Sequence, residues 1–157
     1  MQQIHMASNE VLVVVDMQPY FAASRKPSVI EANVNLVRRF RRMNRPIAIV
    51  EYYGGGDYLE DGDGDTHRPI MKELDGYSRF GVLWKNDDDG SSVVQDWLSE
   101  MKIIPSKFWV TGVNGCWCVA STAEGLELRY PDVVVRYVKK AINCSCSSGC
   151  EYQRRAA

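Results

Sequence analysis

The stretch Val11-Leu12-Val13-Val14-Val15 consists of five consecutive apolar residues, most of them β-branched. A strand with one face in water alternates apolar and polar residues, whereas a continuous apolar run is typical of a strand covered on both faces. Such strands lie at the centre of parallel sheets, where helices pack on either side. The stretch therefore predicts an α/β domain in which this segment is a central strand.

The rest of the chain alternates between helical and strand patterns. Apolar residues recur at helical spacing over residues 27–43, and the arginines between them are interpreted as a solvated outer face. A second apolar run follows at 47–50. Three further strands and two further helices are predicted, the strands at 80–84, 108–110 and 133–138 and the helices at 91–101, capped by Ser91 or Ser92, and 115–128. This order predicts a three-layer α/β fold with a central, mainly parallel sheet of five or six strands and right-handed crossovers.

The composition is that of an ordinary soluble domain. Hydrophobic residues make up 45% of the chain and charged residues 25%. The formal net charge of −1 shows no bias toward nucleic acids or anionic membranes, so we expect neither as a partner. No apolar run is long enough for a membrane span or a signal peptide, and a cytoplasmic location is expected. Residues 1–157 are predicted to form one domain, with 1–5 as an added leader and 144–157 as a short polar tail.

The polar segment 54–78 has the length expected of a loop over a site. It contains one predicted short helix at 69–74, with Thr66 as its cap. His67 is interpreted as a surface residue, because one histidine cannot build a metal site.

Three alternating aspartates in this loop resemble the start of a calcium-binding loop: Asp61, Asp63 and Asp65. That loop requires a glycine where this chain has Thr66 and a bidentate acid where it has Lys72. The sequence therefore excludes a calcium site of this type.

Five cysteines occur without a secretory segment, which favours reduced thiols over a disulfide framework. Three of them form a Cys-x-Cys-x3-Cys pattern at Cys144, Cys146 and Cys150. Structural zinc sites usually pair two such elements across a longer gap, and no second half is present in the sequence. The pattern is interpreted as accessible or loosely packed thiols, and no metal or cofactor is expected.

Three reactive side chains come at the ends of predicted strands. Asp16 follows the first strand, Lys85 the third, and Cys118 lies just past the fourth. Ligands of parallel sheets bind outside the carboxyl ends of the strands, so these side chains should converge on one cleft. A helix N-terminus lowers the pKa of a cysteine in its first turn, which predicts a thiolate at Cys118. A carboxylate base and a cation beside a thiol can activate that thiol as a nucleophile.

Three blocks of the sequence resemble one family, the isochorismatase-like cysteine hydrolases, which include nicotinamidases and carbamoylsarcosine amidase. The blocks are Val13-Val14-Val15-Asp16-Met17-Gln18, Lys85 after a short strand, and Gly112-Val113-Asn114-Gly115-Cys116-Trp117-Cys118-Val119. The resemblance covers about residues 10–143 and implies a Rossmann-like sheet and a homodimer or homotetramer. It also implies an Asp–Lys–Cys triad in which Asp16 is general base and acid, Lys85 positions and polarises, and Cys118 is the nucleophile.

The same resemblance implies a local geometry around the nucleophile. It predicts a cis peptide between Val113 and Asn114 and an oxyanion hole formed by the backbone amides of Asn114 and Cys118. Cys116 stands where many members have aspartate, which makes Cys118 the predicted nucleophile. Metal-binding nicotinamidases have an Asp-x-His motif after the second strand, and residues 51–57 lack it. The resemblance therefore implies a metal-independent enzyme here.

The predicted activity is hydrolysis of a small amide or related C–N bond. Four aromatic residues are expected to line the cleft and to favour a flat or apolar small-molecule substrate: Phe21, Tyr53, Trp84 and Trp117. Three alternatives remain, namely a catalytically silent binding or assembly module, a vinyl ether hydrolase acting on isochorismate, and a thiol redox protein using Cys116 and Cys118. After the fifth strand the family usually continues through another helix, whereas residues 144–157 are brief and polar.

Overall fold

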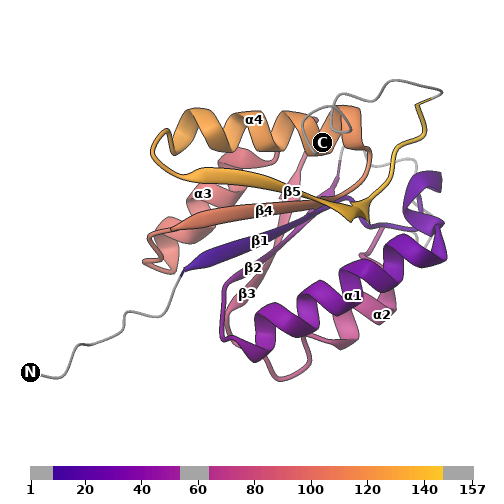
Figure 1. Ribbon diagram of the computed structural model, residues 1–157, viewed down its shortest axis with the longest axis horizontal. Helices are drawn as coiled ribbons and strands as arrows, with labels where there is room; N and C mark the ends of the chain where they lie inside the picture. The colour runs from indigo at the N-terminus through magenta and orange to yellow at the C-terminus, as the bar shows by residue number, and fades with distance from the viewer. Residues whose placement is uncertain (1–8, 54–63, 147–157) are drawn as a thin grey trace, which may run out of the picture.

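The computed structural model describes residues 9–53 and 64–146 of the chain. Its centre is a five-stranded, all-parallel sheet with strand order β3-β2-β1-β4-β5 (Figure 1). The strands are β1 (Glu10–Val15), β2 (Ile47–Tyr52), β3 (Phe80–Lys85), β4 (Lys107–Gly112) and β5 (Val134–Ile142). The α/β prediction is confirmed, with the apolar run of β1 in the middle of the sheet.

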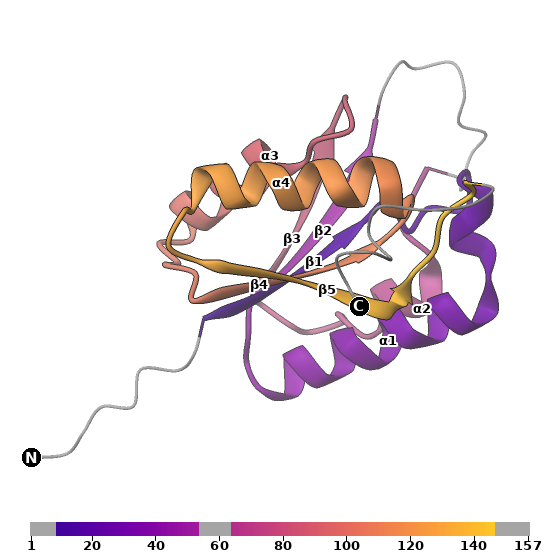
Figure 2. The same ribbon diagram turned by 45° about the horizontal axis from the view of Figure 1, so that its top comes forward.

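Helices cover both faces of the sheet and complete three layers (Figures 1 and 2). The helices are η1 (Ala22–Arg25), α1 (Pro27–Arg42), α2 (Arg68–Lys72), α3 (Ser91–Glu100) and α4 (Ala120–Arg129). In both views α1 and α2 lie on one face, and α3 and α4 lie on the other. Among the described residues, no helix is long and apolar enough to cross a membrane.

The side chains of β1 divide between two hydrophobic cores. Leu12 and Val14 pack in the core on the α1 side, and Val11, Val13 and Val15 pack in the core beneath α3 and α4. All five are at most 1% exposed. Burying one such side chain contributes about 1.5–3 kcal/mol. This two-sided burial explains why the run does not alternate with polar residues.

Two predicted helix caps were wrong. The Thr66 amide and hydroxyl both donate to Glu51 Oε2, at 2.7 and 3.1 Å, and the short helix α2 begins after His67. Helix α3 begins at Ser91, but its N-terminus is capped by Asp89, whose Oδ1 accepts the Ser91 N–H at 2.7 Å. At α3 a carboxylate thus accepts the N–H expected to bond to a hydroxyl, whereas Thr66 is held by Glu51 and no side chain caps α2.

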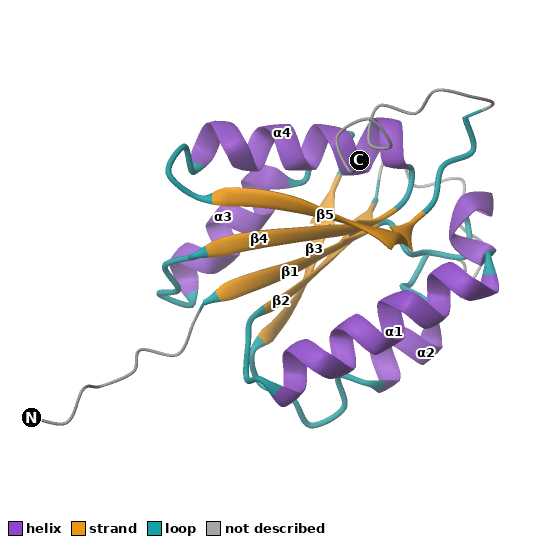
Figure 3. Cartoon of the chain, viewed as in Figure 1, coloured by secondary structure: helices purple, strands orange, loops and turns teal. Residues whose placement is uncertain are grey.

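The carboxyl ends of the strands meet at one edge of the sheet, where the functional residues were predicted (Figure 3). At this edge β1 and β4 approach so closely that a β carbon on Gly112 would lie 1.9 Å from the Val15 carbonyl oxygen. Gly112 also has φ +111, which disfavours any other residue. The predicted cis peptide between Val113 and Asn114 is present directly after this glycine.

Candidate active site

A buried ion pair joins the ends of β1 and β3. Lys85 Nζ lies 3.1 Å from Asp16 Oδ2, and the two side chains are 2% and 1% exposed. The lysine comes from β3 and passes over the ring of Tyr52 in β2, with Nζ 5.0 Å from the ring centroid. Lys85 Nζ also donates to the Asp87 carbonyl oxygen at 2.8 Å. These contacts fix the cation at the carboxyl edge of the sheet.

Asp16 occupies a backbone conformation that few residues adopt. Its φ is +51, in the left-handed region that aspartate tolerates better than most residues and that recurs at functional sites. Oδ1 is buried without a partner of good hydrogen-bond geometry among the described residues, while Oδ2 is held by Lys85. One carboxylate oxygen is therefore anchored and the other is available as a proton acceptor.

Cys118 lies in the first turn after β4. Residues Gly115–Val119 form a π-helical turn, a geometry frequent at functional sites, and α4 continues from it. The Cys118 thiol is buried and interacts with the Asp16 carboxylate, whose pKa is raised by burial, an effect that the hydrogen bond to Cys118 partly offsets. The structure thus brings Asp16, Lys85 and Cys118 together at one point, as the positions of their strands predict.

The proton balance of the site differs from the sequence prediction. Burial, together with the neighbouring Asp16 carboxylate, raises the pKa of the Cys118 thiol, although Lys85 opposes this. Burial also raises the pKa of Asp16, and the charge of Lys85 partly offsets that effect. The position at the start of a helix allows a thiolate, but desolvation outweighs that effect here. The thiol keeps its proton until a base removes it.

Asp88 is a second acid near the thiol that sequence reasoning missed. Cys118 Sγ donates to Asp88 Oδ1 at 3.8 Å. Buried Thr122 in α4 holds this loop: its Oγ1 accepts the Gly90 N–H at 2.9 Å and donates to the Asp88 carbonyl oxygen at 3.4 Å. The run of three aspartates at 87–89, two residues after Lys85, was the available signal for an acid at this place.

The two amides predicted to form an oxyanion hole lie on the same turn. Asn114 directly precedes the turn, and its carbonyl oxygen accepts N–H bonds from Trp117 and Val119, both at 3.1 Å. Cys118 lies between these two donors in the chain. The turn is therefore closed around the peptide of Asn114, and the thiol and both predicted donors belong to one rigid unit.

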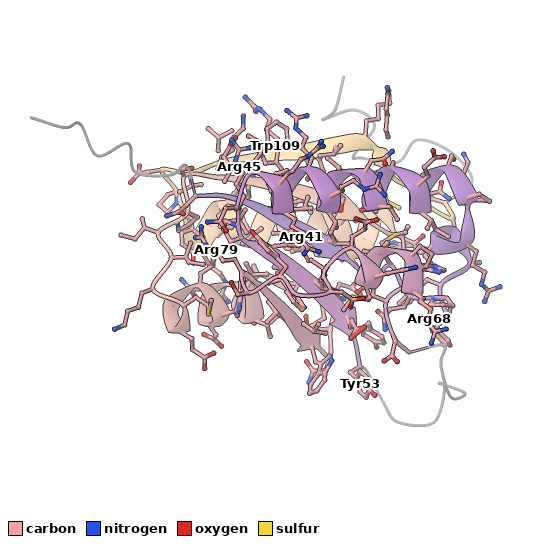
Figure 4. All side chains as sticks on the ribbon, turned by 90° about the horizontal axis from the view of Figure 1, so that it is seen from below. Arg41, Arg45, Tyr53, Arg68, Arg79 and Trp109 are labelled. Atoms are coloured by element: carbon pink, nitrogen blue, oxygen red, sulfur yellow. The ribbon has the colours of Figure 1, made fainter. Side chains whose placement is uncertain are left out.

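The four predicted aromatic residues do not form one cluster. Tyr53 projects from the end of β2 (Figure 4), and its ring centroid lies 5.7 Å from that of Trp84. Phe21 instead contacts the rings of its neighbour Tyr20, at 5.2 Å, and of Tyr52, at 6.0 Å. Trp117 is about half exposed on the nucleophile turn.

Two cavities lie along this edge. One of about 270 Å³ is lined by Tyr53, Trp84 and Lys85 together with the following loop and the start of α3. A larger one of about 740 Å³ lies between Glu51, Trp84 and the start of α2. Among the described residues, Cys118 lines neither cavity, and of the three predicted catalytic residues Lys85 lines the smaller one.

Other sequence predictions concern histidine and the tail. His67 is half-buried rather than on the surface, and its Nε2 lies 2.9 Å from Ser24 Oγ. The Asp61 and Asp63 positions and Cys150 lie outside the described residues. The tail was predicted to begin at residue 144, but residues 143–146 pack against the body of the domain.

The tail thiols are also better ordered than predicted. Cys144 and Cys146 gather with Cys116, and the three sulfur atoms lie within 4.8 Å of one another. Cys116 Sγ and Cys144 Sγ are 3.0 Å apart. Burial raises the pKa of the Cys144 thiol, but hydrogen bonds with Cys116 and Cys146 outweigh it and lower the pKa to about 7. Cys144 and Cys146 are partly exposed, as the interpretation of accessible thiols expects, and they also cluster with Cys116, which the sequence did not indicate.

Comparison with known proteins identifies the family. Residues 10–154 match the model of the isochorismatase domain. The chain belongs to the isochorismatase family. This is a family of hydrolases, and the resemblance found in the sequence is confirmed. No curated protein sequence matches the chain.

Solved structures of related isochorismatase-fold proteins agree with this assignment. N-carbamoylsarcosine amidase from Thermoplasma acidophilum is similar with a TM-score of 0.73 and 18% identity, over 93% of this chain and 89% of that one. MAR1 ribonuclease from Caenorhabditis elegans has a TM-score of 0.76 and 20% identity, over 96% of this chain and 72% of that one. Nicotinamidase/pyrazinamidase from Bacillus subtilis has a TM-score of 0.74 and 14% identity, over 94% of this chain and 93% of that one. At these identities the similarity establishes the isochorismatase fold and not a substrate.

Proposed function

We propose that this isochorismatase-family protein is a cysteine hydrolase that cleaves a small amide or related C–N bond through a thioester on Cys118. The observation that carries the proposal is the buried Asp16–Lys85 ion pair beside the Cys118 thiol. Burying a charged pair is costly unless its geometry is well satisfied. An unpartnered, buried oxygen on this aspartate is best explained by a role in proton transfer.

The first step requires Asp16 to act as a base. Because the pKa of the Cys118 thiol is raised, attack on the substrate has to be coupled to transfer of the thiol proton to the carboxylate. Asp16 has a raised pKa as well, which makes it a stronger base than an exposed aspartate. Lys85 balances the single negative charge that Asp16 and Cys118 share before and after this transfer.

The following steps return the enzyme to its starting state. The sulfur forms a bond to the carbonyl carbon, and the resulting oxyanion accepts hydrogen bonds from the amides of Asn114 and Cys118. Protonated Asp16 gives its proton to the leaving nitrogen, and the C–N bond breaks to leave a thioester. Water then loses a proton to Asp16 and attacks the thioester, which releases a carboxylic acid and the Cys118 thiolate. The thiolate takes the proton back from Asp16. Each amide of the hole contributes about 2.7–4 kcal/mol to the transition state.

The surroundings favour a substrate with a flat portion. The rings of Tyr53 and Trp84 lie beside Lys85 and line the smaller cavity, and both are more than half exposed. Exposed aromatic rings at the mouth of a site can stack on a planar group of a ligand. We therefore place the non-reacting part of the substrate against these two rings.

The test is acylation of the protein by a panel of small aromatic and aliphatic amides, followed by mass spectrometry of the intact chain and its peptides. We expect at least one amide to be hydrolysed and an acyl adduct to appear on Cys118. Asp16→Asn should slow acylation by about 10²–10⁴-fold, the usual contribution of a general base. Asp75→Asn, which neutralises an exposed aspartate elsewhere, is the matched control and should not change the rate.

Two outcomes would contradict the proposal. If an activated ester labels Cys116 and not Cys118, the nucleophile has been assigned to the wrong thiol. If no amide is hydrolysed and no acylating reagent modifies Cys118, the chain is the catalytically silent module considered from the sequence.

A further inference from the structure

We propose that Cys116, Cys144 and Cys146 bind one zinc-class divalent ion, which ties the turn that carries Cys118 to the segment after β5. The three residues come from two separate parts of the chain, 28 positions apart, yet their sulfur atoms lie within 4.8 Å of one another. This cluster is separate from the proposed triad and needs no assumption about hydrolysis.

Backbone hydrogen bonds hold the two segments in place before any ion binds. The Asn143 N–H donates to the Gly112 carbonyl oxygen at 3.2 Å, and the Gly115 N–H donates to the Asn143 carbonyl oxygen at 3.0 Å. The Asn143 side chain adds a bond from Nδ2 to the Ala23 carbonyl oxygen at 2.9 Å. The segment after β5 is thus anchored on both the nucleophile turn and η1. Preorganised ligands of this kind lower the cost of assembling a metal site.

Alternation along the tail turns two thiols to the same side. Ser145 is turned toward Asn114, whose Oδ1 accepts the Ser145 N–H at 2.9 Å and the Ser145 hydroxyl at 3.2 Å. In an extended segment, residues two apart point to the same side and the residue between them points away. With Ser145 bound to Asn114, Cys144 and Cys146 both face Cys116. The Cys-x-Cys spacing is what this geometry requires.

The three sulfur atoms are close enough to share one ion, although the Cys116–Cys144 pair, at 3.0 Å, has to open slightly to receive it. Zinc–sulfur bonds of about 2.3 Å in a tetrahedral site place sulfur atoms roughly 3.8 Å apart. A disulfide between Cys116 and Cys144 would use two thiols and leave the convergence of Cys146 unexplained. Thiolates select zinc and other soft or borderline ions over magnesium or calcium. The cluster therefore fits a zinc-class ion better than a cross-link.

The surroundings leave room for a fourth ligand. All three cysteines are partly buried and pack against the core beneath α3 and α4. Three thiolates complete three corners of a tetrahedron, and water or another side chain supplies the last.

The main experiment titrates the reduced, chelator-treated full-length protein with Co²⁺ and follows the thiolate-to-cobalt charge-transfer absorption. We expect saturation at one equivalent and displacement of the band by Zn²⁺. Cys116→Ser, Cys144→Ser and Cys146→Ser should each weaken cobalt binding by more than about 100-fold, because loss of a ligand costs more than loss of a group that merely orients one. Cys118→Ser removes a thiol from the same turn and is the matched control, with unchanged binding.

A second measurement avoids dependence on variants that fail to fold. Hydrogen exchange of the wild-type protein should slow on addition of Zn²⁺ at the amides of Gly115, Asn143 and Ser145, which connect the two segments. The absence of a saturable cobalt band in the fully reduced protein would overturn the proposal. A Cys116–Cys144 disulfide in protein isolated under nitrogen would overturn it as well. Neither result would bear on hydrolysis by Cys118, which the acylation test addresses separately.

Discussion

Replacing Lys85 by methionine removes the cation from the most deeply buried ion pair in the described part of the chain. Lys85 and Asp16 are 2% and 1% exposed, and their atoms are 3.1 Å apart. Methionine approximates the length of the lysine stem, so the change leaves little empty volume. What remains is an Asp16 carboxylate without its partner, with one oxygen that already has no good hydrogen bond.

The expected loss of folding stability is large because the buried Asp16 carboxylate cannot be solvated by water. Breaking a buried pair by removing one partner typically costs about 3–5 kcal/mol. Replacing both partners removes the uncompensated charge, so the double variant Asp16→Asn/Lys85→Met should recover most of this loss. The Asp16→Asn and Lys85→Met changes should therefore be coupled by at least about 2 kcal/mol.

The destabilisation caused by Lys85→Met should also depend on pH, and the titration of Asp16 decides whether it grows or shrinks as the pH rises. Burial raises the pKa of Asp16 in the folded protein, and the attraction to Lys85 that opposes this is lost in the variant. A group with a raised folded pKa contributes stability below its unfolded pKa, and this contribution is lost as the pH rises through the folded pKa. Lys85→Met should therefore be less destabilising at pH 5, where more of the carboxyl is protonated, than at pH 8.

The assay is urea unfolding of wild type, both single variants and the double variant at pH 5 and pH 8, followed by circular dichroism. The expected pattern is a loss of about 3–5 kcal/mol for Lys85→Met at pH 8 and a smaller loss at pH 5. A loss below about 1 kcal/mol would mean that the pair behaves like an exposed salt bridge. Equal losses at both pH values would mean that Asp16 does not titrate as its burial requires.

Three further predictions concern the edge that carries the site. Iodoacetamide should alkylate Cys118 slowly at pH 7 and faster only above the usual thiol pKa of about 8.5, because burial raises the pKa of this thiol. Peptide mass spectrometry measures the labelling, and rapid labelling of Cys118 at pH 6 would contradict the prediction. Gly112→Ala should cost about 2–6 kcal/mol in thermal unfolding, because it combines a strained backbone with a close contact, and an unchanged melting temperature would be inconsistent with the approach of β1 and β4. Thr122→Val should cost about 1–3 kcal/mol by leaving the buried Gly90 N–H without its acceptor, whereas Thr122→Ser should restore most of the stability in the same urea assay.

The strands and the convergence of the triad could be predicted because each depends on a short, local pattern. An unbroken apolar run such as 11–15 reports burial on two faces, and a parallel sheet brings the residues after such runs to one edge. Asp16, Lys85 and Cys118 could therefore be brought together from their positions alone. Their pKa values could not, because desolvation depends on how completely the surrounding loops cover them.

The residues that the sequence did not reveal all depend on loop or strand-end geometry. Asp88 approaches the thiol because Thr122 holds its loop, and no periodic pattern specifies that contact. Strand β5 continues through Lys139 and Lys140 to Ile142, although two lysines favour an earlier end. A register shift against β4 accompanies this extension. The extension places Asn143 beside Gly115, and so the tail thiols beside Cys116.

The turn Gly115–Val119 separates the thiols of Cys116 and Cys118, which lie two residues apart in the sequence. Residues two apart in a helical turn lie on roughly opposite sides of its axis, so their side chains point in different directions. Cys118 faces Asp16 and the ends of β1 and β3, while Cys116 faces Cys144 and Cys146. A disulfide between Cys116 and Cys118 would have to reverse one of these directions, which argues against the redox alternative. One turn can then hold a nucleophile on its inner side and be fixed by a metal on its outer side, without either thiol competing for the other's role.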